Sequence, residues 1–368
     1  MVAGMERRDA VIVGGGPAGS SCARALVAAG LDVLVIDRAR FPRDKTCAGW
    51  ITPAVVQALD LPVDDYRQHH VCQPITGFRT SRMGSAAVET RFGATVSYGI
   101  CRLEFDHYLL ERSGARRLEG APVGRLERHG GGWVIDGRIE TPMLVGAGGH
   151  LCPVARALGA RPADEPAIVA QEVELSLTPR QAAQCRVNPE MPDLQLCRDL
   201  RGYGWCFRKG DRVNIGLGRQ DPADLPAHVR AFAGALVLTG TLPPGLATRW
   251  KGHAYLLRDA STRPVVDDGV LLAGDAAGLA SAISGEGIRP AIESGLLAAA
   301  TILAARGRYT RDALQPYADG LEARFPRARR SPLLTWSRGL AAAAVGPLLS
   351  TPWFSRHVLL ERWFLQAA

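Results

Sequence analysis

A glycine-rich turn near the start of the chain constrains the fold more than any other feature. Gly14, Gly16 and Gly19 stand in the spacing GxGxxG, directly after the apolar, β-branched run 10–13. An alanine-rich stretch follows, and then a second apolar run at 33–36. Short apolar runs cut off by glycine are typical of buried strands, and the alanine-rich stretch favours a helix. The segment therefore predicts a strand–turn–helix–strand unit of a Rossmann-like α/β fold.

This unit is suited to bind a dinucleotide. The first glycine makes the turn, the second lets the backbone approach the pyrophosphate, and the third lets the helix pack on the strand. The helix begins at Pro17 and Ala18 and directs unpaired N–H groups toward the phosphates. Asp37 ends the second strand, where it can accept hydrogen bonds from a ribose, and Arg38 adjoins it. An acid at this position disfavours a 2′-phosphate, so the sequence predicts FAD or NAD rather than NADP.

The composition excludes several classes of protein. Of the 368 residues 47% are hydrophobic and 22% are charged, which argues against wholesale disorder. No apolar run reaches the ~18 residues that a transmembrane helix needs, and the N-terminus lacks the pattern of a signal peptide. The eight cysteines form no CxxC pair and no zinc spacing. We therefore expect reduced thiols, no metal site and a cytoplasmic location.

The net charge of +8 is carried almost entirely by arginine, since lysine stands only at positions 45, 209 and 251. Such a bias is compatible with binding to nucleic acid or anionic lipid, or with a GC-rich genome that encodes surface charge as arginine. The arginines are dispersed and are not interleaved with aromatic residues. The genomic interpretation is therefore favoured, and no nucleic-acid partner is predicted.

A second glycine-rich segment lies far downstream. The apolar run 269–273 ends at Gly274 and Asp275, and residues 284–288 precede a long Ala/Leu-rich helix that is predicted to end near Ala305. This segment resembles the second FAD fingerprint of glutathione-reductase-type flavoproteins. The resemblance implies that Asp275 meets the ribityl–pyrophosphate region. It also implies that the later glycines and the helix start face the flavin ring, through Gly285, Gly287 and Ile288.

Two further segments narrow the resemblance to one branch of these flavoproteins. Residues 145–156 are similar to the GADGxxSxvR segment of aromatic hydroxylases and geranylgeranyl reductases, with Gly148 and Cys152 where Asp and Ser are usual. Residues 102–106 match the RxxFD segment of the same branch, which implies that Arg102 reaches the cofactor. FAD is therefore the expected cofactor.

The segment 41–50 resembles the PRxKxCGG stretch of the geranylgeranyl reductases, with Ala48 in place of glycine. The resemblance implies that Cys47, Ala48 and Gly49 lie near the flavin ring. It also makes Cys47 a candidate catalytic residue that aids reduction or protonation, and nearby cations would favour its thiolate. The alternative is a small residue that simply fits beside the ring.

Aromatic residues alternate along a predicted strand at Tyr203, Trp205 and Phe207, and a return strand follows the turn at 209–211. By spacing alone they could form a plain core face of a sheet. They also resemble the PxxYxWxFP…NxG substrate-cavity motif of the geranylgeranyl reductases, with Leu200 and Arg208 where the prolines are usual. The resemblance implies that the aromatic face forms an apolar wall of a substrate pocket.

The same family implies a Rossmann-like FAD-binding domain of glutathione-reductase type, an inserted antiparallel-sheet substrate domain and a helical C-terminal tail. The predicted ranges are 1–64, 101–164 and 256–320 for the FAD domain, 65–100 and 165–255 for the substrate domain, and 321–368 for the tail. A hairpin over 123–136 is expected within the FAD domain. Arginines alternate with leucine and tryptophan in the tail. This pattern favours helices that cap the pocket and pack on the FAD domain, and it is also compatible with a peripheral membrane helix.

The resemblance implies an FAD-dependent oxidoreductase that reduces a C=C bond in a prenyl or other lipophilic substrate, with NAD(P)H or a ferredoxin-like protein as electron donor. Two alternatives stay open. One is an FAD-dependent monooxygenase that hydroxylates or epoxidises a natural product. The other is a flavoprotein that passes electrons to a quinone or a partner protein. The sequence leaves the substrate, the donor and the oligomeric state undetermined.

Overall fold

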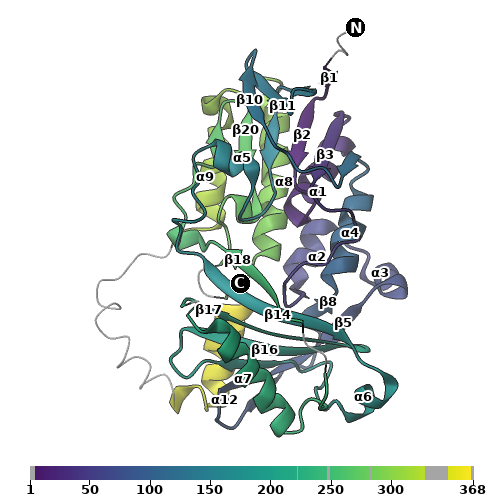
Figure 1. Ribbon diagram of the computed structural model, residues 1–368, viewed down its shortest axis with the longest axis vertical. Helices are drawn as coiled ribbons and strands as arrows, with labels where there is room; N and C mark the ends of the chain where they lie inside the picture. Colours follow the sequence, from purple (N-terminus) through teal and green to yellow (C-terminus); the bar gives the residue numbers. More distant parts are fainter. Residues whose placement is uncertain (1–4, 222, 247–248, 282–283, 328–346, 366–368) are drawn as a thin grey trace, which may run out of the picture.

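The computed structural model describes residues 5–221, 223–246, 249–281, 284–327 and 347–365. Within these residues, helices and several sheets combine into an α/β fold, as predicted. A six-stranded, mostly parallel sheet occupies the upper half of Figure 1, and a seven-stranded, mostly antiparallel sheet crosses the lower half. The predicted division into domains stays a prediction.

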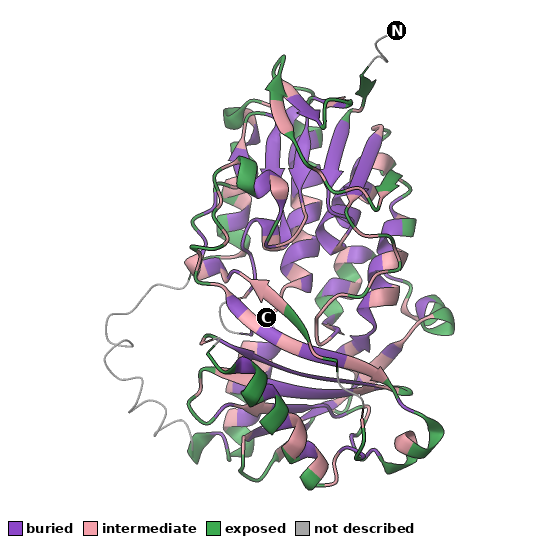
Figure 2. Ribbon diagram, in the orientation of Figure 1, coloured by how far each residue is buried: buried purple, intermediate pink, exposed green. Residues whose placement is uncertain are grey.

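The six-stranded sheet contains the predicted strand–turn–helix–strand unit. Its strands, in spatial order, are β19 (Val266–Asp267), β20 (Val270–Leu272), β13 (Leu144–Gly146), β2 (Ala10–Val13), β3 (Val33–Asp37) and β9 (Arg116–Glu119). All neighbours are parallel except β19 and β20. The central strands are almost wholly buried, as is usual in the middle of a parallel sheet (Figure 2). The carboxyl ends of the parallel strands β2, β3 and β13 lie side by side at one end of the sheet. Ligands bind at this end in such sheets.

The longer helices of this half of the molecule are α1 (Pro17–Ala28), α4 (Arg102–Arg112), α8 (Ile288–Ala305) and α9 (Arg311–Arg324). Helices α1 and α8 pack closely, because a Cβ atom at Gly295 would lie 2.2 Å from the carbonyl oxygen of Ala18. Among the described residues, α8 alone is long and apolar enough to cross a membrane, and most of it is buried inside the protein. That burial is typical of a core helix.

Two small sheets flank the large ones. The predicted hairpin over 123–136 is confirmed in the four-stranded sheet β1 (Glu6–Arg7), β12 (Ile139–Thr141), β11 (Gly132–Ile135) and β10 (Leu126–His129). The three-stranded sheet consists of β4 (Trp50–Ile51), β8 (Ser97–Ile100) and β5 (Cys72–Ile75). The short helices are α2 (Pro53–Leu59), α3 (Val63–His69), α5 (Pro153–Ala157), α6 (Pro179–Gln184), η1 (Arg258–Ala260) and η2 (Gly274–Ala276).

The seven-stranded sheet confirms the predicted aromatic hairpin. Its strands, in spatial order, are β18 (Lys251–Tyr255), β14 (Ile168–Ser176), β17 (Arg212–Arg219), β16 (Gly202–Lys209), β15 (Asp193–Leu196), β6 (Gly77–Arg82) and β7 (Val88–Arg91). All neighbours are antiparallel except β15 and β6. Helix α7 (Leu225–Leu238) lies so close to the sheet that a Cβ atom at Gly204 would meet the Phe232 ring at 2.8 Å.

The described part of the C-terminal segment packs on the seven-stranded sheet. Helix α12 (Pro352–Phe354) leads into the π-helical segment η3 (Ser355–Phe364). Leu359, Leu360 and Phe364 are buried in one cluster with Phe78 and Trp205. The Ser355 hydroxyl lies 2.8 Å from that of Thr80, so the contact also has a polar part. Residues 328–346, which include much of the arginine-rich part of the predicted tail, lie outside the described residues.

Candidate active site

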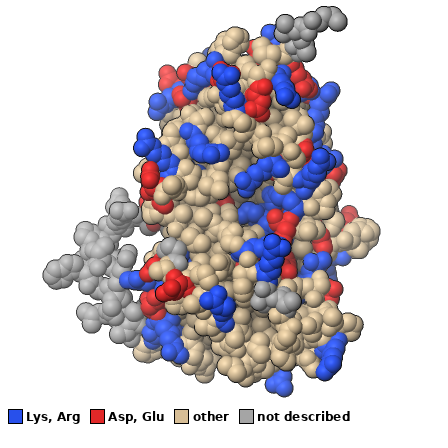
Figure 3. Space-filling model, viewed as in Figure 1, with Lys and Arg blue, Asp and Glu red and all other residues tan. Residues whose placement is uncertain are grey.

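A cavity of ≈ 570 Å³ lies where the end of the parallel sheet faces the seven-stranded sheet. Near the middle of the face drawn in Figure 3, Lys and Arg side chains gather among a few acidic ones. The structure brings sixteen of the predicted site residues together around the cavity: Gly14, Gly16, Pro17, Ala18, Asp37, Arg38, Cys47, Ala48, Arg102, Tyr203, Trp205, Gly274, Asp275, Gly285, Gly287 and Ile288.

Three predicted site residues do not border this cavity. Gly19 lies behind the turn, where a Cβ atom would be 1.9 Å from the carbonyl oxygen of Gly14, so its role is helix–strand packing. Gly49 has φ +64° and packs against the carbonyl oxygen of Ile100. Phe207 was predicted to line the substrate wall, but its ring does not border the cavity. It is fully buried against Trp50, with 5.8 Å between the ring centroids.

The glycine-rich turn forms the cavity wall with backbone. Gly14 has φ +114°, and a Cβ atom there would lie 2.3 Å from the carbonyl oxygen of Ala147. Helix α1 starts after Gly16 with no side-chain cap, so its first N–H groups stay available beside the cavity. An anion at this position would meet both these donors and the positive end of the helix dipole.

Asp37 closes the turn at the end of β3. One carboxylate oxygen accepts a hydrogen bond from the Gly15 N–H at 2.7 Å, and the other accepts one from the Ala39 N–H at 2.8 Å. These two bonds fix the orientation of the carboxylate at the cavity edge. Each oxygen keeps further acceptor capacity, as a ribose hydroxyl would require.

A buried group of charges lies behind the first turn. Arg102 at the start of α4 donates two hydrogen bonds to Asp106, at 2.6 and 2.8 Å, and Arg43 lies 3.0 Å from the same carboxylate. Burial opposes the charged form of Asp106, but the two guanidinium groups hold its pKa below its usual value. Two cations thus share one buried anion beside the cavity. Nη1 of Arg43 has no hydrogen-bond partner among the described residues, and an anionic ligand would supply one.

Asp275 lies across the cavity on the turn η2. Its carboxylate lies 3.3 Å from Nε2 of His253 on β18. Burial raises the pKa of Asp275, but the His253 contact and the charges of Lys45 and Arg102 lower it to about 2. Burial lowers the pKa of Lys45 to about 8, although Asp275 opposes this. Asp275 therefore stays ionised near neutral pH, within a cationic surrounding.

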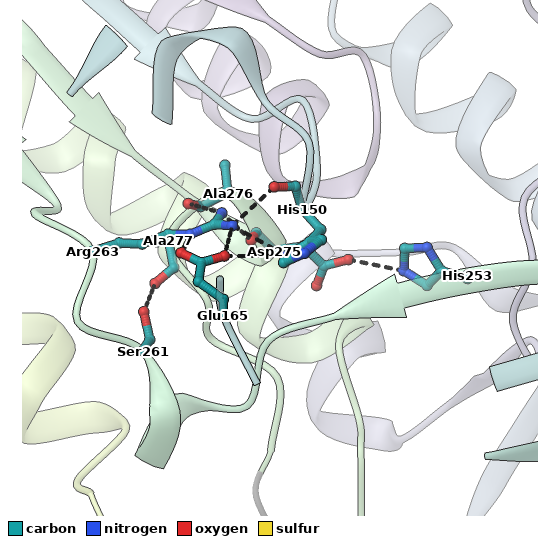
Figure 4. A network of polar contacts seen from close by, with 8 residues as sticks. All are labelled: His150, Glu165, His253, Ser261, Arg263, Asp275, Ala276 and Ala277. Atoms are coloured by element: carbon teal, nitrogen blue, oxygen red, sulfur yellow. Dashed lines mark hydrogen bonds and ion pairs between the residues drawn. The ribbon is translucent and has the colours of Figure 1, made fainter. Parts of the chain in front are cut away.

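Arg263 fixes the backbone around Asp275, as Figure 4 shows. Its guanidinium donates to the carbonyl oxygen of Ala276 at 2.8 Å and to that of His150 at 3.0 Å. The same group forms an ion pair with Glu165, with 2.6 Å between Nε and Oε1. Arg263 thus joins the turn that carries Asp275 to the loop after β13, which forms another part of the cavity wall.

The aromatic wall is held by hydrogen bonds from its own side chains. The Tyr203 hydroxyl donates to the carbonyl oxygen of Ser284 at 2.6 Å, and the Trp205 indole donates to Oδ1 of Asn214 at 2.7 Å. Asn214 then donates to Glu172 at 2.7 Å and to the carbonyl oxygen of Cys47 at 3.1 Å. Burial raises the pKa of Glu172 to about 7, although the Asn214 hydrogen bond opposes this. The segment with Cys47 is therefore tied directly to the wall.

Among the cavity residues that were not predicted, four stand out for their chemistry. His253 and Tyr255 project from β18, Glu286 stands between two predicted glycines, and Phe364 comes from the C-terminal segment. Burial raises the pKa of Glu286 to about 7, which Arg289 opposes. Its place inside the second glycine-rich segment was a usable signal. No local pattern marks the others, because sheet order and C-terminal packing bring them to the cavity.

Comparison with known proteins defines the class. The model of the FAD binding domain family matches residues 7–328, and the chain belongs to this family. Menaquinone reductase of Mycobacterium tuberculosis is 32% identical over 315 residues, which cover 80% of this chain and 76% of that protein. Geranylgeranyl diphosphate reductase of Rhodobacter capsulatus is 31% identical over 322 residues, with 80% and 75% covered. The predicted resemblance to geranylgeranyl-reductase-like flavoproteins is thereby confirmed.

Solved structures agree on the fold. A geranylgeranyl bacteriochlorophyll reductase-like protein from Thermoplasma acidophilum superposes with a TM-score of 0.74 at 22% identity, covering 94% of this chain and 88% of that one. The halogenase PltM superposes with a TM-score of 0.69 at 17% identity, covering 85% and 73%. At these identities the likeness concerns the fold alone, which serves more than one chemistry.

Proposed function

We propose that this protein is an FAD-dependent oxidoreductase that reduces a C=C bond in a prenyl or other lipophilic substrate. The observation that carries the proposal is the composition of one cavity. Backbone glycines and paired charges suited to a dinucleotide line one part of it, and the aromatic side chains of Tyr203, Trp205 and Phe364 line another. The sequence relatives named as menaquinone and geranylgeranyl diphosphate reductases support this assignment.

The residues present fit FAD. Gly14 and Gly16 leave the turn bare for a pyrophosphate, the start of α1 offers N–H groups, and Nη1 of Arg43 lacks a partner among the described residues. Asp37 would bind the adenosine ribose, and Arg38 would adjoin it. Asp275, with Gly274 before it and Gly285, Gly287 and Ile288 after it, would bind the ribityl and flavin parts.

Reduced FAD, when bound, supplies a hydride to one carbon of the double bond. The chain's own residues orient the substrate and exclude water, which is the task of Tyr203 and Trp205. The other carbon needs a proton. Glu286 can hold one near neutral pH, because burial raises its pKa to about 7. Water is the other source of this proton.

Cys47 is proposed to act beside the flavin site, where it aids reduction or protonation. Its sulfur accepts a hydrogen bond from the Gly49 N–H at 3.4 Å, and its carbonyl oxygen accepts one from Asn214. These contacts hold the thiol at the cavity, between the two walls. Ala48 and Gly49 keep the adjoining backbone free of large side chains.

The remaining parts of the proposal concern the electron donor, the source of the substrate and the division into domains. NAD(P)H or a ferredoxin-like protein would reduce the bound FAD, and the lipophilic substrate would come from a cytoplasmic or membrane-associated pool. Trp353 keeps 66% of its surface exposed next to the buried C-terminal cluster, which supports a peripheral membrane contact. The 65–100 and 165–255 ranges are proposed as an inserted substrate domain within a glutathione-reductase-type frame.

The test is anaerobic reduction of geranylgeranyl diphosphate by the protein with photoreduced FAD. We expect a product that gains two hydrogens for each FAD reoxidised, and a rate about 10–100-fold lower for Cys47→Ala at equal FAD content. An unchanged Cys47→Ala rate would exclude its chemical role. A hydroxylated product formed only with oxygen would establish the monooxygenase alternative. Reoxidation by a quinone with no reduced organic product would establish the electron-transfer alternative.

A further inference from the structure

A second cavity of ≈ 460 Å³ adjoins the first. Five residues border both: Tyr203, Tyr255, Ser284, Gly285 and Phe364. The two cavities are therefore separated by little more than a few side chains. An elongated molecule that reached from one cavity into the other would have one end beside the proposed flavin site.

The walls of the second cavity are suited to an uncharged, apolar ligand. Ile168, Leu196, Leu200, Leu257 and Trp363 border it, together with the shared aromatic rings. Among its described lining residues there is no carboxylate, which disfavours a metal ion or an organic cation.

Its only charged lining residues in the described chain are two arginines, and each already has an acidic partner. Arg219 lies 2.7 Å from Asp199, and Arg201 lies 3.5 Å from Asp221. Apolar area is thus what this cavity offers.

Gly218 borders the second cavity and has no side chain to fill it. Gly216 is required by its surroundings, since a Cβ atom there would lie 2.2 Å from the Trp205 ring. Gly202 is required as well, because its Cβ atom would lie 2.0 Å from the carbonyl oxygen of Gly218. Gly218 differs from both. Its backbone has no positive φ, and its Cβ atom would lie 3.6 Å from the nearest atom, which is ordinary contact. Neither the backbone nor close packing demands glycine there, so its effect is the open space.

We propose that the second cavity binds the remote isoprenoid units of a chain-like substrate, and that Gly218 sets the length of chain accepted. The reacting double bond would lie in the first cavity, and the chain would pass Tyr203 and Phe364 into the second. Trp363 and Phe364 of the C-terminal segment form one wall, so that segment shapes the site. The inference rests on the proposed function for its substrate class.

The experiment measures binding of geranyl and geranylgeranyl diphosphate to the FAD-loaded protein, because the two probes share a head group and differ in chain length. The test variant is Gly218→Leu. The control is Gly252→Leu on β18, an exposed position that borders neither cavity and whose Cβ atom would meet nothing closer than 4.0 Å. Flavin absorbance and the unfolding midpoint establish that each variant is folded.

We expect the unsubstituted protein to bind the longer probe at least about tenfold more tightly. Gly218→Leu should weaken binding of the longer probe by about tenfold or more and of the shorter probe by less than about twofold. Gly252→Leu should change neither affinity. Gly218→Ala should give a smaller loss in the same direction, which provides a test even if Gly218→Leu does not fold.

Equal losses for both probes, or none, would overturn the inference. So would an unsubstituted protein that binds both probes equally or neither of them. Because binding needs no turnover, the two proposals fail separately. Chain-length discrimination without anaerobic reduction would refute the reductase and keep the cavity assignment. Anaerobic reduction with no effect of the Gly218 substitutions on binding would keep the reductase and refute the cavity assignment.

Discussion

The two walls of the cavity are built by different means. The wall at the end of the parallel sheet is mostly backbone, and Gly14 and Gly274 adopt positive φ values there. The wall from the seven-stranded sheet is mostly side chain, and Tyr203, Trp205 and His253 project from two of its strands. The first wall therefore depends on the absence of Cβ atoms, and the second depends on which side chains alternate along a strand.

This difference suits the two walls to different tasks, which are holding a cofactor and selecting a substrate. A backbone wall presents the same N–H groups whatever the neighbouring side chains are, which suits a cofactor of fixed shape. A side-chain wall can change one residue at a time without moving the backbone, which suits the selection of a substrate. Substitutions in the backbone wall should therefore affect cofactor binding and stability together. Substitutions in the aromatic wall should leave the cofactor in place.

The largest effect is expected for Gly14→Ala. The new Cβ atom would lie 2.3 Å from the carbonyl oxygen of Ala147 at a residue with φ +114°. Overpacking and backbone strain should lower the free energy of unfolding by about 2–5 kcal/mol. The same displacement should reduce FAD affinity by about tenfold or more. Urea unfolding and the ratio of flavin to protein absorbance measure both quantities.

The matched control is Gly234→Ala inside helix α7, where a Cβ atom meets nothing within 4 Å. It should raise the free energy of unfolding by about 0.5–1 kcal/mol, since alanine favours a helix, and leave FAD content unchanged. A Gly14→Ala protein with normal FAD content would show that this wall is less dependent on bare backbone than its geometry indicates.

The backbone wall is also built from the two segments that the sequence singled out. The residues from Gly14 to Gly19, and those from Gly274 to Ile288, form two short local segments whose glycines carry their own signal. The aromatic wall was predicted only in part. Alternation placed Tyr203, Trp205 and Phe207 on one face, but the packing of Trp50 removes Phe207 from the cavity. The contact of His253 with Asp275 depends on the order of strands in the sheet, which no local pattern encodes.

A second, smaller effect is expected on the pH dependence of the free energy of unfolding, through the buried Glu172 behind the aromatic wall. Burial raises the pKa of Glu172 to about 7 from its ordinary 4.5. Between these pH values the folded chain holds a proton that the unfolded chain has released, so the free energy of unfolding falls as the pH rises. Glu172→Gln stays neutral and should lose this slope, gaining about 3 kcal/mol relative to the unsubstituted protein between pH 4.5 and 7.5.

Urea unfolding at several pH values measures the Glu172→Gln difference. Glu127→Gln, in a partly exposed pair with Arg125, is the control and should keep the slope. Parallel pH profiles for Glu172→Gln and the unsubstituted protein would mean that this carboxyl ionises in the folded state as readily as in water. The Asn214 hydrogen bond would then be made to a charged carboxylate.

The smallest effect is expected where the two walls touch. The Tyr203 hydroxyl on β16 donates to the carbonyl oxygen of Ser284, in the segment that leads to Gly285 and Gly287. Tyr203→Phe removes this hydrogen bond but retains the ring that contacts Phe364 with 5.1 Å between centroids. The free energy of unfolding should fall by about 1 kcal/mol, while FAD content stays the same, because the glycine-rich backbone keeps its own contacts. A Tyr203→Phe protein that loses FAD would show that the aromatic wall holds the flavin segment in place, and that the two walls act as one site.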